Sequence, residues 1–369
     1  MNPMPATEAL AVVFDTARQV SFRAIPVPAP VGREVLVKIV GCTLCGSDLH
    51  TFEGRRQVPI PTILGHEIVG QIECFGDQAA RIDLAGTALN VGDRVAWAIV
   101  ANCDGCFYCR RGLPQKCLHS VKYGHEPLQV ASARPGGDLL GGLADHCLLV
   151  PGTKIMRLSA DVPLAAACPA SCATATAMAA LAAAGPIAGR SLAVMGAGML
   201  GLTTCAIAST RGAEHVICVD PKEERSARSL AFGAAVASDA PRFAEHCQPL
   251  TDGHGLDVVI EMSGAPAAFD LGLSQLRLGG TMILVGAVFP STAIALTTEH
   301  VVRRCLKIQG VHNYAPSDFQ LAVEFLNDHH ATFPFAELVE NWWPLNEADK
   351  AFAHAASSGA IRIGVRPDR

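Results

Sequence analysis

Four cysteines lie close together in the segment NCDGCFYCRRGLPQKC. They are Cys103, Cys106, Cys109 and Cys117, and their spacing is C-x2-C-x2-C-x7-C. Four thiolates this close can surround one tetrahedral Zn²⁺ ion, which would hold a short loop that apolar packing alone could not. A pair of disulfides is the alternative, but nothing else in the chain indicates secretion.

Cysteine, histidine and acidic residues also occur together in two short motifs nearer the N-terminus. The first is CGSDLH at residues 45–50 and the second is GHE at residues 65–67. Thiolate, imidazole and carboxylate groups bind zinc in proteins, and histidine also carries protons near neutral pH. Each motif is common alone, and the residue types in both are ones that can bind a metal.

A glycine-rich motif of the form GxGxxG occurs at Gly196, Gly198 and Gly201. It follows the apolar run SLAVM and opens a helical segment, which is the context of a dinucleotide-binding turn. The first glycine makes the turn, the second admits a pyrophosphate, and the third lets the helix pack on the strand. The helix N-terminus then offers free N–H groups to the phosphate.

Asp220 and Arg225 are the residues that bear on whether the site prefers NAD or NADP. Asp220 stands nineteen residues after Gly201 at the end of the next apolar run, where a carboxylate accepts hydrogen bonds from the ribose hydroxyls. Arg225 lies about one helical turn further on and would attract a 2′-phosphate, but we interpret it as a surface cation near Asp220 and the adenine. The sequence therefore predicts NAD rather than NADP.

The motifs, in this order, resemble those of the medium-chain zinc-dependent alcohol dehydrogenases, and the resemblance covers nearly the whole chain. Cys45 and His66 match the first two catalytic zinc ligands of that family. Cys172 matches the third, because Thr176 then occupies the family's position beneath the nicotinamide. Cys168, four residues earlier, is the competitor, and we interpret it as a buried core thiol. The four-cysteine segment matches the structural-zinc lobe, so two zinc ions per chain are implied.

The resemblance also implies a mechanism in which a zinc-bound alkoxide transfers hydride to NAD. Ser47 would take the alcohol proton and pass it through the nicotinamide ribose to His50 at the surface. Glu67 would serve as a resting or transient zinc ligand, or as a neighbouring carboxylate that does not bind the metal. Asp48 would accept the free N–H of His66 and fix its tautomer.

Two positions near the expected pyrophosphate differ in what they offer. Gly46 stands where some members of the family carry a pyrophosphate-binding arginine. Arg362, in the segment SGAIRIGV, matches a second family position that reaches the pyrophosphate. Ala173 departs from the glycine that often follows the third zinc ligand, so the local backbone there is less defined by the resemblance.

The elements that must position these residues fall into two groups. EVLVKIV, EIVGQIEC and DRVAWAIV are short β-branched runs, which predict a small, partly open β-barrel, the GroES-like catalytic domain of the family. SLAVMGAG, HVICVD, LDVVIEMSG and TMILVG lack alternation and alternate with helical segments, which predicts a doubly wound parallel Rossmann sheet. We expect a catalytic domain over 1–170 and 310–369, with its metal lobe near 102–118, and an NAD-binding domain over 171–309.

Composition supports an ordinary globular enzyme of this α/β class. The chain has 369 residues, 50% apolar and 17% charged, with a net charge of −5, so there is no basic field for nucleic acid or anionic lipid. No signal peptide is apparent at the N-terminus, and eight further scattered cysteines are expected to be buried free thiols, as in the cytoplasm. Residues 162–189 are alanine-rich and nearly uncharged, and we expect a buried helix between the domains.

Three alternatives remain beside the alcohol dehydrogenase interpretation. Zinc-free reductases of the same superfamily lack the ligand cysteines, and a catalytically silent NAD- and zinc-binding redox sensor would not need the complete set of motifs. The sequence segments YGHE, CATATAM and GVHNY resemble those of a branch of this family that is associated with phosphonate catabolism. A substrate of that kind, rather than a polyol, would require cations at the pocket mouth, for which the candidates are Arg55, Arg56, Lys122 and His125. The alternative interpretation, which we favour, is that these four residues are ordinary surface charges. The partner implied is a small alcohol or carbonyl compound, in a homodimer or homotetramer.

Overall fold

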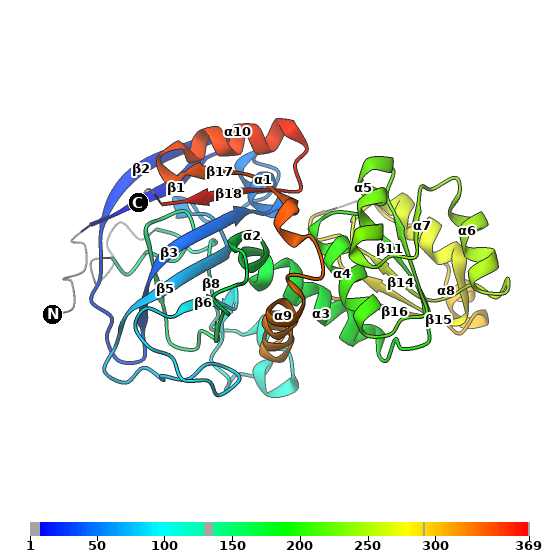
Figure 1. Ribbon diagram of the computed structural model, residues 1–369, viewed down its shortest axis with the longest axis horizontal. Helices are drawn as coiled ribbons and strands as arrows, with labels where there is room; N and C mark the ends of the chain where they lie inside the picture. Colours follow the sequence, from blue (N-terminus) through cyan, green and yellow to red (C-terminus); the bar gives the residue numbers. More distant parts are fainter. Residues whose placement is uncertain (1–7, 129–135, 291, 368–369) are drawn as a thin grey trace. The chain divides into compact units, whose positions relative to one another are not determined.

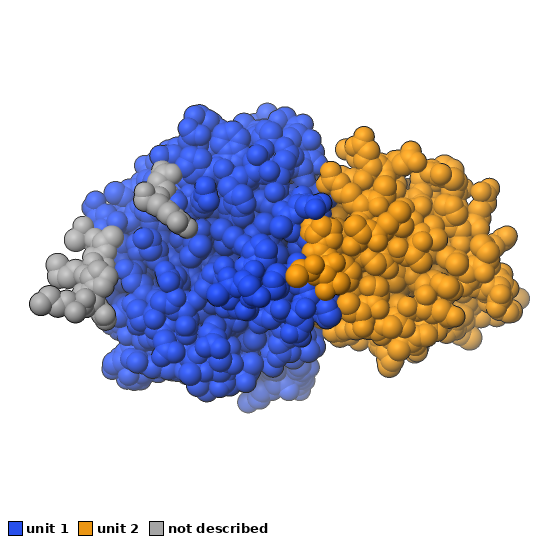
Figure 2. Space-filling model, in the orientation of Figure 1, with its two compact units in different colours: residues 1–172, 315–330, 335–369 blue, residues 173–314, 331–334 orange. Residues whose placement is uncertain are grey.

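The computed structural model describes residues 8–128, 136–290 and 292–367. The chain forms two compact units (Figure 2). Unit 1 consists of Met1–Cys172, Ala315–His330 and Phe335–Arg369, and unit 2 of Ala173–Tyr314 and Ala331–Pro334. The main breaks thus follow Cys172 and Tyr314, where the sequence analysis placed them after residues 170 and 309.

The main sheet of unit 1 combines the β-branched runs of the first third of the chain with two strands from its end (Figure 1). Its order is β10-β6-β5-β3-β18-β17, and β9 also pairs with β3. β3 is buried along most of its length because β5, β9 and β18 all pair with it. The strands are β3 (Val35–Leu44), β5 (Glu67–Phe75), β6 (Arg94–Trp97), β9 (His146–Leu149), β10 (Ile155–Arg157), β17 (Val339–Pro344) and β18 (Arg362–Arg366).

Smaller sheets and short helices complete unit 1. The order β2-β1-β4 forms one sheet, and β7 pairs with β8. These strands are β1 (Glu8–Thr16), β2 (Gln19–Pro26), β4 (Thr62–Ile63), β7 (Val100–Ala101) and β8 (Val121–Lys122). The helices are α1 (Gly46–Phe52), α2 (Leu164–Ala167), α9 (Pro316–His329) and α10 (Ala348–Ser358), with 3₁₀ turns at Cys109–Arg111, Pro114–Lys116, Cys168–Ser171, Phe335–Leu338 and Leu345–Glu347.

Helix α10 shows how the end of the chain joins the core of unit 1. Its apolar residues recur at helical spacing, so one face is buried, with Phe352 fully enclosed. The ring of Phe352 stacks on that of Phe52 with 4.5 Å between the ring centroids. Since Phe52 is the last residue of α1, this contact fixes the helix that begins at the first predicted zinc ligand.

Unit 2 is a parallel sheet of the doubly wound type. Among its described residues the strand order is β13-β12-β11-β14-β15-β16, and every pairing is parallel. This order reverses direction at β11, which is where such sheets bind dinucleotides. The strands are β11 (Ser191–Met195), β12 (His215–Val219), β13 (Val236–Ser238), β14 (Leu256–Glu261), β15 (Leu276–Leu284) and β16 (Lys307–Gly310).

The helices of unit 2 alternate with these strands along the chain (Figure 1). β11, β12 and β14 are buried almost throughout, as their continuous apolar sequences predicted. The helices are α3 (Ala173–Ala184), α4 (Met199–Thr210), α5 (Glu223–Arg228), α6 (Phe243–Leu250), α7 (Pro266–Gln275) and α8 (Thr298–Arg303), with a 3₁₀ turn at Ser229–Phe232.

The structure corrects two expectations about the alanine-rich segment and the cysteines. Residues 162–189 do not form one buried helix: α2, a 3₁₀ turn and α3 follow one another, because Pro169 and the non-helical backbone of Cys172 interrupt the helix. Cys74 and Cys305 are exposed rather than buried. No single helix in the described part of the chain is long and apolar enough to cross a membrane. Two consecutive helical segments, Leu164–Ser171 and Ala173–Ala184, meet the length and composition criteria only when taken together, and the chain bends between them.

Candidate metal and cofactor sites

Three side chains from separate parts of unit 1 form the candidate catalytic metal site. Cys45, His66 and Cys172 place one sulfur or nitrogen atom each within 4.8 Å of the others. Cys45 is the N-cap of α1, directly after β3, and His66 directly precedes β5. Cys172 ends the 3₁₀ turn that follows α2. The adjacent ends of β3 and β5 therefore supply the first two groups, and the break in the alanine-rich segment supplies the third.

Local backbone contacts hold each of the three residues in place. The carboxylate of Asp48 accepts the N–H of Cys45 at 2.9 Å, which closes the first turn of α1. Gly65 has a φ of +90°, and a Cβ there would lie 2.7 Å from the sulfur of Cys42, so only glycine allows the turn that presents His66. Ser171 donates to the carbonyl of His66 at 3.0 Å and ties the third segment to the second.

His66 is oriented for metal binding through its ring nitrogens. Its Nδ1 lies 3.2 Å from Asp48 Oδ1, in an oblique contact that is not a well-formed hydrogen bond. Nε2 lies 3.4 Å from the hydroxyl of Ser47 and is the nitrogen left for a metal. Burial opposes the charge on the ring, but the carboxylate of Asp48 and the sulfur of Cys45 outweigh it and raise the pKa of His66 to about 10. The pocket therefore favours a positive charge at this point.

The two thiols of the site are spaced for one tetrahedral ion. Cys45 Sγ and Cys172 Sγ are 3.9 Å apart, far beyond the length of a disulfide. Two thiolates on one zinc, each about 2.3 Å from it, stand about 3.8 Å apart. The hydrogen bond from Cys172, helped by Arg362, holds the pKa of Cys45 well below its usual range. The donor set and its spacing thus fit zinc with three protein ligands and one open position.

Glu67 is close to this site but already has other partners. It is fully buried, and its carboxylate accepts Nε and Nη2 of Arg362 at 2.8 and 2.9 Å and the hydroxyl of Thr43 at 2.6 Å. Arg362 Nη2 also lies 3.5 Å from Cys45 Sγ. Burial raises the pKa of Glu67, although Arg362 opposes this. Arg362 therefore faces Glu67 and Cys45 within unit 1, and its contact with a pyrophosphate stays a prediction.

Ser47 and His50 lie three residues apart on α1, so they share a face of the helix. The hydroxyl of Ser47 adjoins the metal-facing nitrogen of His66, while His50 is only half-buried. Arg55 Nε donates to His50 Nδ1 at 2.9 Å, so Nδ1 is unprotonated in this arrangement. Burial and then the charge of Arg55 lower the pKa of His50, which keeps the ring neutral, and Nδ1 could accept a proton only by giving up its contact with Arg55.

The four-cysteine segment forms a second, separate cluster in unit 1. Cys103, Cys106, Cys109 and Cys117 all lie within 4.8 Å of one another through their sulfur atoms. The Cys103–Cys117 and Cys106–Cys109 sulfur pairs are each 3.5 Å apart, so neither is a disulfide. Backbone N–H groups of Cys109 and Leu118 lower the pKa of Cys106 to about 6. Four converging thiols without an open position fit a structural zinc ion.

In unit 2 the glycine motif has the geometry that a dinucleotide requires. Gly196 has a φ of +107°, which makes the turn after β11. A Cβ on Gly201 would lie 1.8 Å from the carbonyl oxygen of Gly196, so the helix can pack here only with glycine. Gly198 is the N-cap of α4, and a Cβ there would meet no protein atom within 4 Å. That open space beside free helix N–H groups fits a pyrophosphate.

Asp220 follows β12 and is buried at 6% exposure. One of its oxygens accepts the N–H of Ala197 at 2.9 Å and the other accepts the N–H of Lys222 at 2.9 Å. A carboxylate has further lone pairs, so Asp220 can still accept ribose hydroxyls. Arg225 lies on α5 and Thr176 in the first turn of α3, both half-buried. Their contacts with a cofactor stay predictions.

Several contacts around the metal site were not foreseen from the sequence. Thr43 pairs with Glu67 in the β3–β5 register, which a predicted hairpin register would have revealed. The Arg362 contact depends on β18 lying beside β3, for which the sequence holds no local signal. Cys168, the competing ligand, is fully buried and outside the ligand group, and burial raises its pKa.

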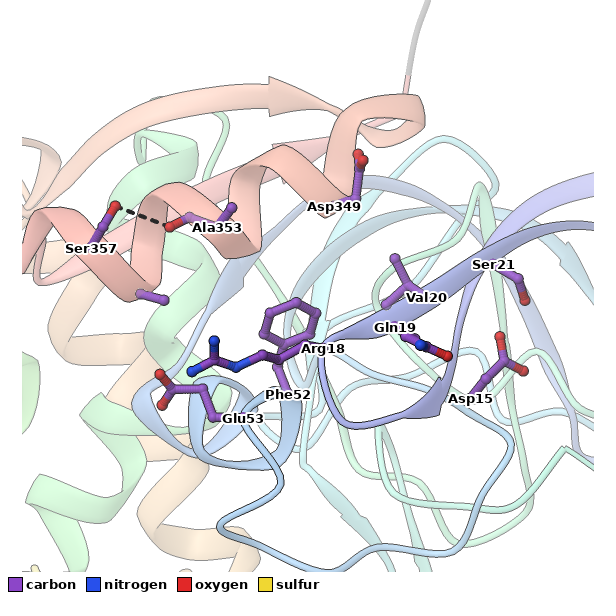
Figure 3. A pocket seen from close by; sticks show the side chains of 11 residues that line it. Asp15, Arg18, Gln19, Val20, Ser21, Phe52, Glu53, Asp349, Ala353 and Ser357 are labelled. Atoms are coloured by element: carbon purple, nitrogen blue, oxygen red, sulfur yellow. Dashed lines mark hydrogen bonds between the residues drawn. The ribbon is translucent and has the colours of Figure 1, made fainter.

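A further cavity of about 910 Å³ lies elsewhere in unit 1, between the β1–β2 turn, the end of α1 and α10 (Figure 3). Its polar lining includes Asp15, Arg18, Glu53 and Asp349. Asp15 pairs with Arg23, and Glu53 with Arg55. Because two of its carboxylates are already neutralised and the metal-site residues do not line it, we assign it no part in the chemistry.

Two clusters of metal ligands in unit 1 and a dinucleotide-binding turn in unit 2 define a zinc-binding, nucleotide-dependent dehydrogenase. Residues 32–160 match the alcohol dehydrogenase GroES-like domain, and residues 200–328 match the zinc-binding dehydrogenase family. The chain therefore belongs to the medium-chain zinc-dependent alcohol dehydrogenase family. It is an oxidoreductase acting on CH–OH groups, with zinc and a nicotinamide dinucleotide as cofactors.

Three relatives show how far the similarity extends. L-threonine 3-dehydrogenase of Pyrococcus furiosus is 30% identical over 296 residues, 78% of each chain. Sorbitol dehydrogenase of Halalkalibacterium halodurans is 29% identical over 355 residues, 93% of this chain and 94% of the other. An alcohol dehydrogenase structure from Thermotoga maritima superimposes with a TM-score of 0.90 at 26% identity, covering 98% of this chain and 100% of that one.

Proposed function

We propose that the protein oxidises a small alcohol with NAD, using the Cys45, His66 and Cys172 site for catalysis and the four-cysteine cluster for structure. The observation that carries this proposal is the open position of a three-ligand site beside the hydroxyl of Ser47. When bound, zinc at this site would supply Lewis acidity that makes the alcohol easier to deprotonate, and NAD would accept the hydride.

The residues of unit 1 would prepare the alcohol for this reaction. Ser47 would hold the substrate hydroxyl and take its proton, since its Oγ adjoins the metal-facing nitrogen of His66. His50, on the same face of α1, would release that proton to solvent, and its lowered pKa keeps it in the neutral, accepting form. Asp48 would hold the His66 ring, and Arg362 would keep Glu67 charged next to the site.

We propose that unit 1 is the catalytic domain and that unit 2 binds the dinucleotide. Asp220 would favour NAD, because the 2′-phosphate of NADP would meet a carboxylate there. Replacing Asp220 with serine should narrow the preference for NAD, which we expect to be about tenfold or more in kcat/KM. Equal kcat/KM for the two cofactors in the unaltered protein would contradict the assignment. A homodimer or homotetramer in the cytoplasm stays a prediction from the family.

The test of the function is elemental analysis together with a screen of alcohols. We expect two zinc ions per chain and NAD reduction with at least one class of neutral, polyol or phosphonate-bearing alcohol. Zinc and NAD binding without any turnover would favour the alternative of a silent, redox-sensing protein. One zinc per chain, with the Cys45 site empty, would overturn the catalytic assignment.

A further inference from the structure

The sequence analysis named four cations near the expected substrate, and the structure separates one of them from the other three. Arg55 forms an ion pair with Glu53 and donates a hydrogen bond to His50, so a carboxylate of the protein already balances its charge. Arg56 and Lys122 make no side-chain hydrogen bond or ion pair within the described ranges. A partly buried cation without an acidic partner can gain more from an anionic ligand than a fully solvated one.

A single turn brings Lys122 and His125 to the metal site. The N–H of His125 donates to the carbonyl of Lys122 at 3.1 Å, which closes the turn after β8. Gly124 within this turn packs so tightly that a Cβ would lie 2.6 Å from the carbonyl oxygen of Gly65. The turn therefore rests on the residue before His66, and the ring of His125 lies 5.3 Å from the ring of His66, centroid to centroid.

The side chains of this turn are directed by their other contacts. Tyr123 is fully buried and its hydroxyl bonds to Thr153, so it points into the core. His125 Nδ1 lies 2.9 Å from the carbonyl of Tyr123, which can only accept, so Nδ1 carries the hydrogen and Nε2 of the neutral ring is a hydrogen-bond acceptor. Glu126 accepts the backbone N–H of Lys122 at 2.7 Å.

Arg56 reaches the same region from the end of α1. Its N–H donates to the carbonyl of His50 at 3.0 Å, which extends the last turn of the helix. Burial and then Arg56 lower the pKa of Lys122 to about 8, while the sulfurs of Cys172 and Cys45 act in the opposite direction. Burial, Lys122 and then His66 and Arg56 lower the pKa of His125. The charges of Arg56 and Lys122 therefore act on each other, and the Lys122 charge also interacts with the two thiols of the metal site, while the His125 ring is neutral.

These two thiolates cannot serve as the counter-charge once the site holds its metal. Two thiolates and one Zn²⁺ ion sum to a formal charge of zero, −2 + 2. The cavity of Figure 3 provides a contrast, because Asp15 and Glu53 there already have arginine partners. Beside the metal, Arg56 and Lys122 have no such partner within the described ranges, so they are available to an anionic group of a ligand.

We propose that Arg56 and Lys122 form an anion subsite beside the metal, so that the substrate is an alcohol that carries a carboxylate or a phosphonate-type group. This inference rests on the proposed function, since it places the hydroxyl at the metal and the anion on the cations. It distinguishes the protein from one that would take a neutral polyol, for which unpaired cations at the site would bring only a desolvation cost.

The test uses matched pairs of alcohols and two simple anions with the zinc-loaded protein. The alcohols are 3-hydroxybutyrate against butane-1,3-diol, and 2-hydroxyethylphosphonate against propan-1-ol, each compared by kcat/KM with NAD. Acetate and methylphosphonate are titrated by calorimetry without NAD, which reads the subsite independently of turnover. The variants are Lys122→Met and Arg56→Gln, with Lys350→Met and Arg81→Gln as exposed controls.

We expect an anionic alcohol to exceed its neutral partner about tenfold or more in kcat/KM, and Lys122→Met to weaken binding of the matching anion about tenfold. Arg56→Gln should act in the same direction, and both should lower the ratio of anionic to neutral kcat/KM, which the controls leave unchanged. Binding of methylphosphonate but not acetate would support the subsite and narrow the substrate to tetrahedral anions.

Two results would overturn the subsite. One is a neutral alcohol oxidised as well as its anionic partner, with neither anion bound. The other is anion binding that Lys122→Met and Arg56→Gln leave unchanged, which would place the anion on the metal alone. Failure of the proposed function looks different, because no alcohol would then be oxidised while the calorimetric titration would still report the subsite.

Discussion

The two cysteine clusters of unit 1 are built in opposite ways. Cys103, Cys106, Cys109 and Cys117 lie within one short, largely exposed segment, and their spacing alone brings the sulfurs together. Cys45, His66 and Cys172 come from the ends of separate elements and are largely enclosed. A local cluster can hold a loop, whereas a cluster assembled by the fold can leave one position open next to Ser47 and His50.

The largest expected effect comes from breaking the assembled cluster. Cys45→Ser should lower kcat/KM by about a thousandfold or more, because the Lewis acid of the reaction would be lost. The fold should persist, since β3 and α1 are held by other contacts. Steady-state kinetics, zinc analysis and circular dichroism would check this. Full activity in the variant would remove Cys45 from the catalytic site.

Breaking the local cluster should act on stability instead. Cys103→Ser should release one zinc ion and lower the free energy of unfolding by roughly 3 kcal/mol or more, because little else holds the lobe. Thermal denaturation with and without a chelator would measure the change. A chelator should destabilise the unaltered protein and have little further effect on the variant. An unchanged melting temperature would argue against a structural ion.

The carboxylate of Asp48, which lies next to the His66 ring, distinguishes the catalytic cluster from the four-cysteine cluster, whose ligands are all cysteines. Asp48→Asn should weaken zinc at the assembled site about tenfold to a hundredfold, since the ring would lose its fixed tautomer. Competition with a chromophoric chelator would resolve the two ions by affinity. Asp349→Asn, the same change at an exposed carboxylate on α10, is the control and should leave both affinities nearly unchanged.

The smallest expected effect concerns the proton path at the assembled site. His50→Gln should slow alcohol oxidation about tenfold near neutral pH and less at alkaline pH, where hydroxide takes the proton directly. In the unaltered protein the pKa of His50 is lowered, so the neutral base is present at pH 7 and the rate should fall only as pH drops through that lowered value. Stopped-flow rates with deuterated alcohol would show, through the isotope effect, whether hydride transfer limits the measured rate. Matching profiles in the two proteins would mean that the proton leaves elsewhere.

The sequence predicted the features that depend on local pattern. The four cysteines, the glycine turn and the buried strands β11, β12, β14 and β15 could be identified because spacing and periodicity are written within a few residues. β13 and β16 were not foreseen, because one is three residues long and the other is mostly polar. The third ligand of the metal site required the family resemblance to choose Cys172 over Cys168.

What the sequence could not predict are contacts between distant segments. The bidentate pairing of Glu67 with Arg362 joins residues at opposite ends of the chain. Nor does spacing show that Arg55 is paired while Arg56 and Lys122 are not. These facts follow from which strand neighbours which, and that is decided by packing of the whole unit rather than by local propensity.

The position of β18 has a consequence for how the molecule is made. This strand lies between β3 and β17, and its Ile363 pairs with Leu44, so the sheet of unit 1 can be completed only after unit 2, which lies between β3 and β18 in the sequence, has been synthesised. Until then the nascent chain exposes one edge of β3 and buries Glu67 without its arginine. Unit 2 is translated within that interval. The slowest and most aggregation-prone stage of biogenesis should therefore be the pairing of β18 with β3, and a chain that ends before β18 would have an unfinished sheet.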